Sequence, residues 1–156
     1  MIAQSMTGSG HGGADKYERI ERTLREFLDA NRPCEGRLPR EVDEIVRFIH
    51  EHLFEESLNV NLVRARCRLR NNNVSARFRR VLGLGIREYV EQLRLDAARS
   101  LLGHRELEVY LIAMTVGYQH QETFCRAFQR RFGQTPSERR LQATSAAPGG
   151  PEGARN

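Results

Sequence analysis

The sequence predicts an all-α protein, and three observations lead to this fold class. Apolar residues recur every three or four positions through most of the chain, which is the periodicity of a helix with one buried face. Two pairs of short helical segments carry the same arrangement of apolar residues and glycines, and one longer amphipathic segment lies between the pairs. We therefore expect two helix-turn-helix subdomains joined by a long linker helix, with a short extra N-terminal helix.

The N-terminal part is expected to hold one helix between two irregular segments. Residues 1–14 are rich in glycine and serine and are predicted to be disordered. Residues 15–39 are predicted to form a short amphipathic helix and a linker that contains proline and glycine. The apolar residues of this helix are Tyr17, Ile20, Leu24, Phe27 and Leu28. Because such a helix is marginal alone, we expect it to pack on the rest of the chain; the alternative is that it covers a partner protein.

Residues 40–84 are predicted to form the first helix-turn-helix unit. Its opening helix, Arg40–Leu53, has one apolar stripe and an acidic outer face, which we expect to point away from a polyanion. Asn59 is expected to cap a second helix over Val60 to about Arg66. A turn then leads to a third helix from about Asn72 to Leu82.

The remaining elements are a linker helix over residues 85–103, a second unit over residues 104–141 and a tail. The helices predicted in the second unit are Leu107–Thr115, Gln121–Phe132 and a closing helix from Pro136 to about Leu141. Gly117 suits the sharp turn between the first two, because only glycine takes a positive φ without steric cost. The tail, residues 142–156, is rich in alanine, proline and glycine and is predicted to be disordered.

The two units read as copies of one another. The matching residues are Val74 with Phe124, Phe78 with Phe128, and Gly83 with Gly133. Because the three phenylalanines of the second unit recur every four residues, they are predicted to lie on one buried face of their helix. The second helix of such a motif can enter a DNA major groove.

The motif of the second unit resembles the AraC/XylS family of transcriptional regulators. The residues that carry the resemblance are Ile112-Ala113, Gly117-Tyr118, Phe124, Arg126, Phe128, Phe132-Gly133-Gln134-Thr135-Pro136-Ser137 and Arg140. The similarity extends roughly from Val42 to Arg140. It implies an all-helical DNA-binding domain with two helix-turn-helix units, and double-stranded DNA as the partner. A linker helix of roughly 16 residues would be about 24 Å long, which with offsets at its ends could place two reading helices one DNA turn, about 34 Å, apart.

The exposed faces of the two reading helices supply the predicted DNA contacts. Candidate base contacts are Gln121, Glu122, Thr123 and Arg126 in the second unit, and Asn72, Asn73 and Ser75 in the first. Amide, carboxylate and guanidinium groups match donors and acceptors on base edges in the major groove. Candidate phosphate contacts are Arg70, Arg77, Arg79, Arg80, Arg130, Arg131 and Arg140.

The first unit departs from the family pattern at three positions. Arg68 stands where the second unit has Gly117, and Arg64 stands where it has Ala113. A residue other than glycine in a left-handed turn costs about 1–2 kcal/mol. Ala76 stands where the second unit has Arg126, so one expected base contact is missing. We therefore expect the second unit to carry most of the sequence specificity and the first to anchor on phosphates.

Composition narrows the function classes. The net charge of +5 favours polyanionic partners, and an acid-free run of arginines from Arg64 to Arg80 follows an acidic helix, which predicts two faces of opposite charge. The three cysteines have no ligand spacing, so no metal site or cofactor is expected. No nucleophile–base constellation or phosphate-binding glycine loop stands out, so we expect no enzyme activity.

The favoured hypothesis is a sequence-specific transcriptional regulator that binds DNA as a monomer, with RNA polymerase as a further candidate partner. The residues before Arg40 are too few for the effector-binding domain of many family members, so the chain resembles stand-alone members or a truncated regulator. The alternative is an interaction module with a degenerate first unit and only non-specific DNA binding, whose partner surface would be the Tyr17–Leu28 helix. Without an apolar run of membrane-spanning length or a signal peptide, a cytoplasmic location at the bacterial nucleoid is expected.

Overall fold

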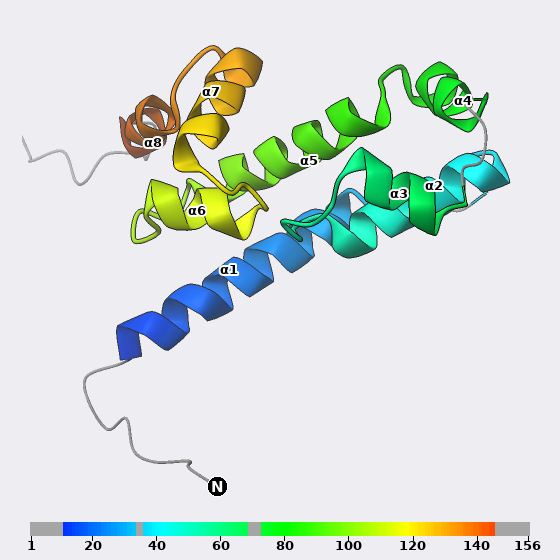
Figure 1. Ribbon diagram of the computed structural model, residues 1–156. Helices are drawn as coiled ribbons and strands as arrows, with labels where there is room; N and C mark the ends of the chain where they lie inside the picture. Colours follow the sequence, from blue (N-terminus) through cyan, green and yellow to red (C-terminus); the bar gives the residue numbers. More distant parts are fainter. Residues whose placement is uncertain (1–10, 34–35, 69–72, 146–156) are drawn as a thin grey trace, which may run out of the picture.

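A computed structural model describes residues 11–33, 36–68 and 73–145 of the chain (Figure 1). These residues form eight α-helices and no β-strand, which confirms the all-α prediction. The helices are α1 His11–Ala30, α2 Arg40–His52, α3 Val60–Arg66, α4 Asn73–Leu82, α5 Ile86–Leu101, α6 Val109–Thr115, α7 Gln121–Phe132 and α8 Pro136–Ser145. The linker helix α5 joins α2–α4 at one end to α6–α8 at the other.

The first and last helices are longer than the sequence predicted. Helix α1 begins at His11, so residues 11–14, which were expected to be disordered, are helical. Once a helix has nucleated, each further turn costs little, and an Arg19–Asp15 ion pair at 3.0 Å supports this end. Helix α8 continues to Ser145 instead of ending near Leu141. The disorder predicted for residues 1–10 and 146–156 falls outside the described residues.

Two hydrophobic cores lie at the two ends of α5. The core of the first unit joins α2, α3 and α4 to the beginning of α5 and includes Val46, Val63, Phe78 and Val90. The core of the second unit joins the rest of α5 to α6 and α7 and includes Leu95, Leu101, Ile112, Phe124 and Phe128. One amphipathic helix therefore serves both units, which gives the protein its elongated shape (Figure 1).

Helix α1 packs on the chain itself, as the favoured prediction held. Ile20 is 6% exposed within the core of the second unit, and Phe27 packs against both cores. Two polar contacts fix the same helix to the loop after α5: Thr23 Oγ1 lies 3.0 Å from His104 Nε2, and Arg19 lies 3.1 Å from Glu106. In Figure 1, α1 runs along one edge of the molecule while α4 and α7 occupy the opposite edge.

Local signals delimit the helices of both units, and the cap predicted at Asn59 is confirmed. The Asn59 side chain accepts a hydrogen bond from the Leu62 amide at 2.9 Å and so caps α3. Gly83 and Gly133 end α4 and α7 with φ values of 80° and 72°. The next helix after each glycine, α5 or α8, has a glutamate in its first turn that accepts a hydrogen bond from a backbone amide just before the helix. Glu88 accepts from the Gly85 amide and Glu138 from the Thr135 amide. The duplication thus extends to the helix ends.

Candidate nucleic-acid interface

Helix α7 has a buried aromatic face and an exposed polar face. Phe124 and Phe128 are fully buried, and Phe132 is partly buried beside them. The ring centroids of Phe124 and Phe128 are 5.7 Å apart, and those of Phe128 and Phe132 are 4.5 Å apart. These contacts confirm that the phenylalanines are core residues. The four predicted base-contacting residues, Gln121, Glu122, Thr123 and Arg126, are all exposed. The core therefore holds the helix in an orientation that presents these side chains to solvent.

Helix α4 presents a smaller and shorter polar set. Asn73 and Ala76 are exposed and Ser75 is half-buried, whereas Asn72 and Arg70 lie outside the described residues. The turn before α4 contains Arg68 with a φ of 52°, a left-handed conformation that the matching Gly117 adopts with a φ of 94°. Arg68 therefore takes the same left-handed conformation as Gly117, a conformation that has a steric cost for an arginine.

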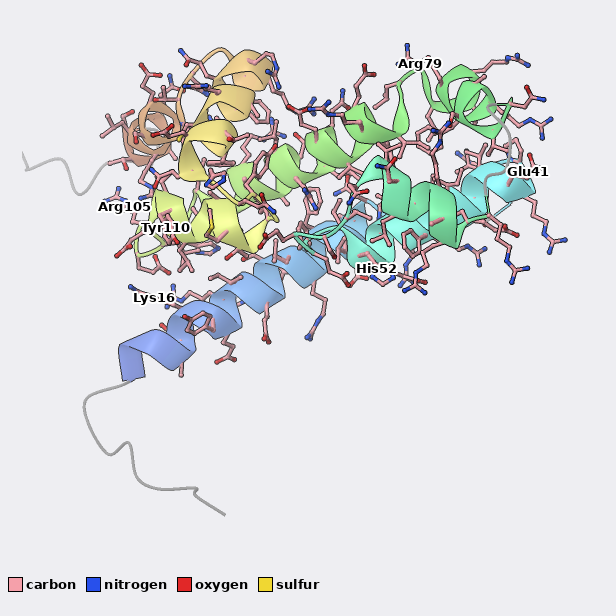
Figure 2. All side chains as sticks on the ribbon, viewed as in Figure 1. Lys16, Glu41, His52, Arg79, Arg105 and Tyr110 are labelled. Atoms are coloured by element: carbon pink, nitrogen blue, oxygen red, sulfur yellow. The ribbon has the colours of Figure 1, made fainter. Side chains whose placement is uncertain are left out.

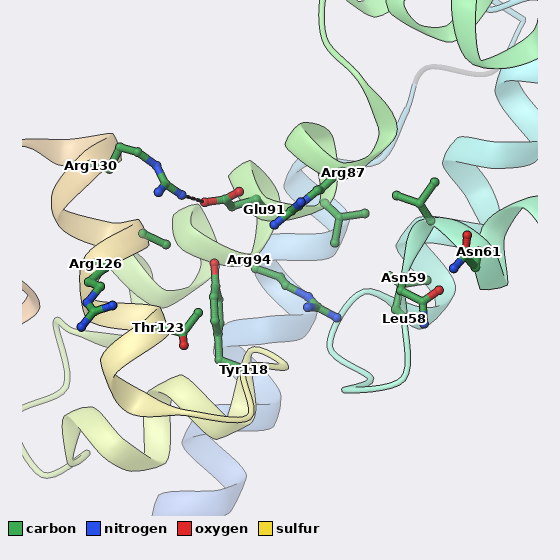
Figure 3. Close-up of a pocket in the computed structure, with 13 residues that line it drawn as sticks. Leu58, Asn59, Asn61, Arg87, Glu91, Arg94, Tyr118, Thr123, Arg126 and Arg130 are labelled. Carbon is green, nitrogen blue, oxygen red and sulfur yellow. Dashed lines mark hydrogen bonds and ion pairs between the residues drawn. The ribbon is translucent and has the colours of Figure 1, made fainter. Parts of the chain in front are cut away.

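Two neighbouring hollows lie between the exposed sides of α4 and α7. A hollow of about 590 Å³ lies between α7 and the beginning of α3, over α5 (Figure 3). A second hollow of about 410 Å³ continues it toward α4. Val60 and Arg87 line both hollows. The name arginine groove is used here for the joined surface, whose polar members include Asn61, Arg64, Ser75, Arg79, Arg87, Thr123, Arg126 and Arg130.

Sequence reasoning did not identify Arg87 and Asn61 as interface residues. Both are exposed, and Arg87 is the second residue of α5, on the side away from its apolar stripe. A charged residue on the polar side of a helix is ordinary in any surface helix, so its pattern carried no signal. Only the packing of α3 beside α5 makes these residues part of the surface between the reading helices.

The predicted phosphate-contacting arginines fall into three groups. Arg77, Arg130 and Arg131 form ion pairs at 2.6, 2.6 and 2.8 Å with Glu41, Glu91 and Asp96. Arg79 is exposed and lies 3.7 Å from Glu88, and Arg80 is exposed with no ion-pair partner among the described residues. Arg140 is partly buried and donates to the Leu107 carbonyl, which ties α8 to the beginning of α6.

These contacts modify the picture of two separate charged faces. The Arg77–Glu41 pair brings the acidic helix α2 into contact with the arginine-rich helix α4, so the two charges partly offset each other there. Exposed ion pairs are worth only about 0–1 kcal/mol, so a phosphate can compete for the same guanidinium. Figure 2 shows Arg79 at the edge that carries α4 and α7, with Lys16 on α1 at the opposite edge.

Arg94 is the one charged residue that is buried in the described part of the chain, and the sequence did not mark it. It is 9% exposed, in the middle of α5, and borders the arginine groove from beneath. Burial lowers the pKa of its guanidinium below the ordinary value for arginine. Arginine remains charged at neutral pH even so, because its pKa starts far above 7.

The other chemical groups of the described chain are unremarkable for catalysis or metal binding. Cys67 and Cys125 are free and partly buried, and burial raises the pKa of both thiols. No group of three or more histidine, cysteine or acidic side chains that could hold a metal ion occurs in the described ranges. Nor does any helix within those ranges have the length and apolarity to cross a membrane.

Comparisons with known proteins agree with this architecture. Residues 64–142 match the model of a helix-turn-helix domain family. Over 99 residues, 64% of this chain and 92% of the relative, the sequence is 32% identical to the regulatory protein SoxS of Escherichia coli K12. Over 135 residues it is 30% identical to the HTH-type transcriptional regulator YtdP of Bacillus subtilis, covering 83% of this chain but 17% of YtdP.

Solved structures show the same fold. The C-terminal domain of AraT, a response regulator from Geobacillus stearothermophilus, superposes with a TM-score of 0.65 at 26% identity, covering 69% of this chain and 88% of that domain. The DNA-binding domain of AdpA, solved with a target DNA, gives a TM-score of 0.64 at 24% identity and covers 72% of this chain and all of that domain. The chain has two helix-turn-helix units on one linker helix, and it matches the family model and the relatives above. It therefore belongs to the AraC/XylS family of DNA-binding transcriptional regulators.

Proposed function

We propose that this protein reads two successive major grooves of double-stranded DNA with α4 and α7, and that α7 carries most of the sequence specificity. The observation that carries the proposal is the exposed polar ridge of α7. Gln121, Glu122, Thr123 and Arg126 lie outside a buried phenylalanine face, and α1 packs at the opposite edge, where it leaves the ridge uncovered. The ridge is therefore free to enter a groove.

The spacing of the two reading helices supports contact with successive grooves. Helix α5 has 16 residues, and 16 residues of α-helix span about 24 Å. Helix α4 lies at the N-terminal end of α5, and α7 packs beside its C-terminal half (Figure 1). Successive major grooves on one face of B-DNA are about 34 Å apart. Both helices can thus face one side of a duplex.

The arginine groove supplies a path for the DNA backbone between the two contacts. Arg87 at its centre and Arg126 at its α7 end are exposed and have no ion-pair partner among the described residues. Guanidinium groups bind phosphate oxygens strongly and without regard to base sequence. We assign Arg79, Arg80 and Arg87 to backbone contacts, with Arg77, Arg130 and Arg131 joining them when phosphate displaces their carboxylate partners.

The two reading helices are unequal in what they offer. Arg126 on α7 can form a bidentate contact with guanine, and Gln121 can pair with adenine. On α4 the matching position holds Ala76, and Ser75 is half-buried. Short side chains reach fewer base edges, so α4 contributes mainly affinity.

We further propose that the protein binds DNA as a monomer, because most of the apolar face of α1 packs on the chain itself and only Tyr17 of that face is exposed. Contact with RNA polymerase, the further candidate partner, stays a prediction. Non-specific binding by a degenerate first unit is the second candidate, and it is favoured by the arginine in the left-handed turn and by Ala76.

Selection of bound duplexes from a random DNA pool tests the two candidates. The proposal expects an enriched sequence with a well-defined block for α7, a weaker block one helical turn away, and binding at a stoichiometry of one. Titration with scrambled duplex should leave a specific component bound. If no sequence is enriched and scrambled DNA competes equally, the non-specific alternative stands in its place.

A further inference from the structure

We infer that Arg94 is the residue that sets the orientation of the two reading helices relative to each other. Its side chain leaves α5 at the boundary between the two cores: Leu93 belongs to the first core and Leu95 to the second. Its guanidinium donates hydrogen bonds to both units. Figure 3 shows it extending from α5 between Tyr118 and the loop that carries Leu58.

The three hydrogen bonds of Arg94 connect segments far apart in the sequence. Nε donates to the Leu53 carbonyl at 2.8 Å and Nη2 to the Glu55 carbonyl at 2.7 Å, both in the loop between α2 and α3. Nη1 donates to the Gly117 carbonyl at 3.2 Å, in the turn between α6 and α7. Both helix-turn-helix units are therefore tied to one planar group whose donors have a fixed geometry.

Gly117 contacts Arg94 so closely that its lack of a side chain has a second purpose besides the turn. A Cβ built on Gly117 would lie 2.8 Å from Cζ and 2.9 Å from Nη2 of Arg94. Real Cβ atoms do not approach that near to a guanidinium, so an alanine here would displace the group as well as strain the positive φ. The turn of the second unit is thus shaped around Arg94.

Burial makes this arrangement selective for one orientation. No carboxylate forms an ion pair with Arg94 among the described residues, so the three carbonyl dipoles are what offsets its desolvation. A buried charge that loses its hydrogen bonds is costly, and a rotation of one unit against the other would break one set of them. Other contacts also join the two units: Phe27 and Phe54 pack against both cores, and Gln119 donates to Glu56 at 2.8 Å in an exposed hydrogen bond. Arg94 is therefore a positioning residue: it lies buried beneath the arginine groove and fixes the spacing and phase of α4 and α7.

A distance measurement in the absence of DNA tests this directly. Spin labels are placed at the exposed positions Ala76 on α4 and Gln129 on α7, in the full chain with Cys34, Cys67 and Cys125 changed to serine. Pulsed electron–electron double resonance should give one narrow distribution of the distance between the two labels in the parent protein. Arg94→Met should broaden it at least about twofold, because the side chain keeps its length but loses all three donors.

A matched control separates loss of charge from loss of the tie. Arg99 is an exposed arginine of the same helix whose contacts, with Asp96 and the Phe132 ring, stay within the second unit. Arg99→Met removes the same charge and should leave the distribution narrow. Equal broadening in both variants, or none in Arg94→Met, overturns the inference.

Two further variants keep the test decisive if Arg94→Met does not fold. Arg94→Lys retains the charge but cannot bond three separated carbonyls. Gly117→Ala leaves Arg94 unchanged but moves its guanidinium away from the carbonyls that it bonds. Both should broaden the distribution, and Gly117→Ala should add little once Arg94 is replaced. Narrow distributions in both would exclude the positioning role.

The DNA readout rests on the proposed function, whereas the distance measurement does not. On a selected duplex, one base pair inserted between the two contact blocks rotates one block by about 35° relative to the other. The parent protein should lose about tenfold or more in affinity, as for a lost base contact, and Arg94→Met should show a spacing penalty of less than about threefold. If the inserted base pair lowers the affinity of Arg94→Met as much as that of the parent protein, the positioning role of Arg94 is contradicted. The absence of any two-block sequence counts against the proposed function instead.

Discussion

Arg130 of α7 donates to Glu91 of α5 at 2.6 Å, so a cationic side chain of the arginine groove is held by a carboxylate while no phosphate is bound. The Arg130 side chain is 71% exposed and that of Glu91 29% exposed, so water screens the pair. In the proposed complex Arg130 exchanges this contact for a phosphate contact, so we expect Glu91 to compete weakly with DNA for Arg130.

Glu91→Gln should therefore raise DNA affinity. Exposed pairs are worth about 0–1 kcal/mol, so the gain should be up to about fivefold, alike for selected and scrambled duplexes. Fluorescence anisotropy of labelled duplexes at fixed salt measures it. Glu26→Gln, which removes an exposed acid from α1 at the opposite edge, controls for the change in net charge. A gain as large in the control would mean that only the net charge matters.

Arg126→Ala should weaken binding to the selected duplex by about 1–3 kcal/mol and relax the base preference at one position, because a bidentate guanine contact is lost. Binding to scrambled duplexes should change far less. A repeat of the pool selection with the variant identifies the position. Arg22→Ala, on α1, removes an equal charge and should preserve the preference. A uniform loss on all sequences would reassign Arg126 to the backbone.

Arg79→Ala should weaken binding to all DNA sequences alike, because the expected partner of Arg79 is a phosphate. If six to eight arginines contact phosphates, log K should fall against log salt with a slope of about −5 to −7. The variant should make that slope shallower by about 1. Affinities measured between low and moderate salt give both slopes. A changed base preference in this variant would contradict the assignment.

Arg68→Gly should stabilise the free protein. The left-handed φ of 52° is unfavourable for arginine by about 1–2 kcal/mol, and the extra freedom of glycine in the unfolded chain offsets part of this, so we expect a gain of about 0.5–1 kcal/mol. Urea unfolding measures it. Arg66→Gly, two residues earlier and still in α3, should instead destabilise by about as much. Destabilisation by Arg68→Gly would mean that its side chain has contacts worth more than the backbone strain.

Acidification should loosen the start of α8. The hydrogen bond from the Thr135 backbone amide, with a second from its hydroxyl, lowers the pKa of Glu138 below its usual 4.5. A carboxylate whose pKa is depressed on folding contributes stability above the unfolded value, and loses it as the pH falls through the folded value. The protection of the Thr135 amide, its exchange rate relative to that of the unfolded chain at the same pH, should therefore fall below a pH of about 4.5, and in Glu138→Gln this pH-dependent loss should disappear. An unaltered pH profile in the variant would rule out this carboxylate as the cause.

The helices and their ends were predictable because local residues determine them. The cap at Asn59, the left-handed glycines at positions 83 and 133, and the phenylalanine series of α7 each depend on neighbours within a turn or two. The exposed ridge of Gln121 to Arg126 followed from the same periodicity. The early start of α1 at His11 did not, because glycine and serine near a terminus resemble a disordered segment whether or not a helix reaches into it.

The contacts of the arginines depended on residues that the sequence alone could not bring together. Arg130 bonds Glu91, Arg77 bonds Glu41, and Arg140 bonds a backbone carbonyl just before α6. The partners in each pair are more than thirty positions apart in the sequence. An arginine on a helix is expected at the surface, so nothing in the pattern around Arg94 distinguished it from Arg99. Hydrophobic periodicity by itself determined that this chain makes two helix-turn-helix units on one linker helix. Only tertiary packing decided which arginines remain free for DNA and which one is buried to hold the two units, because burial and pairing depend on what lies across the contact.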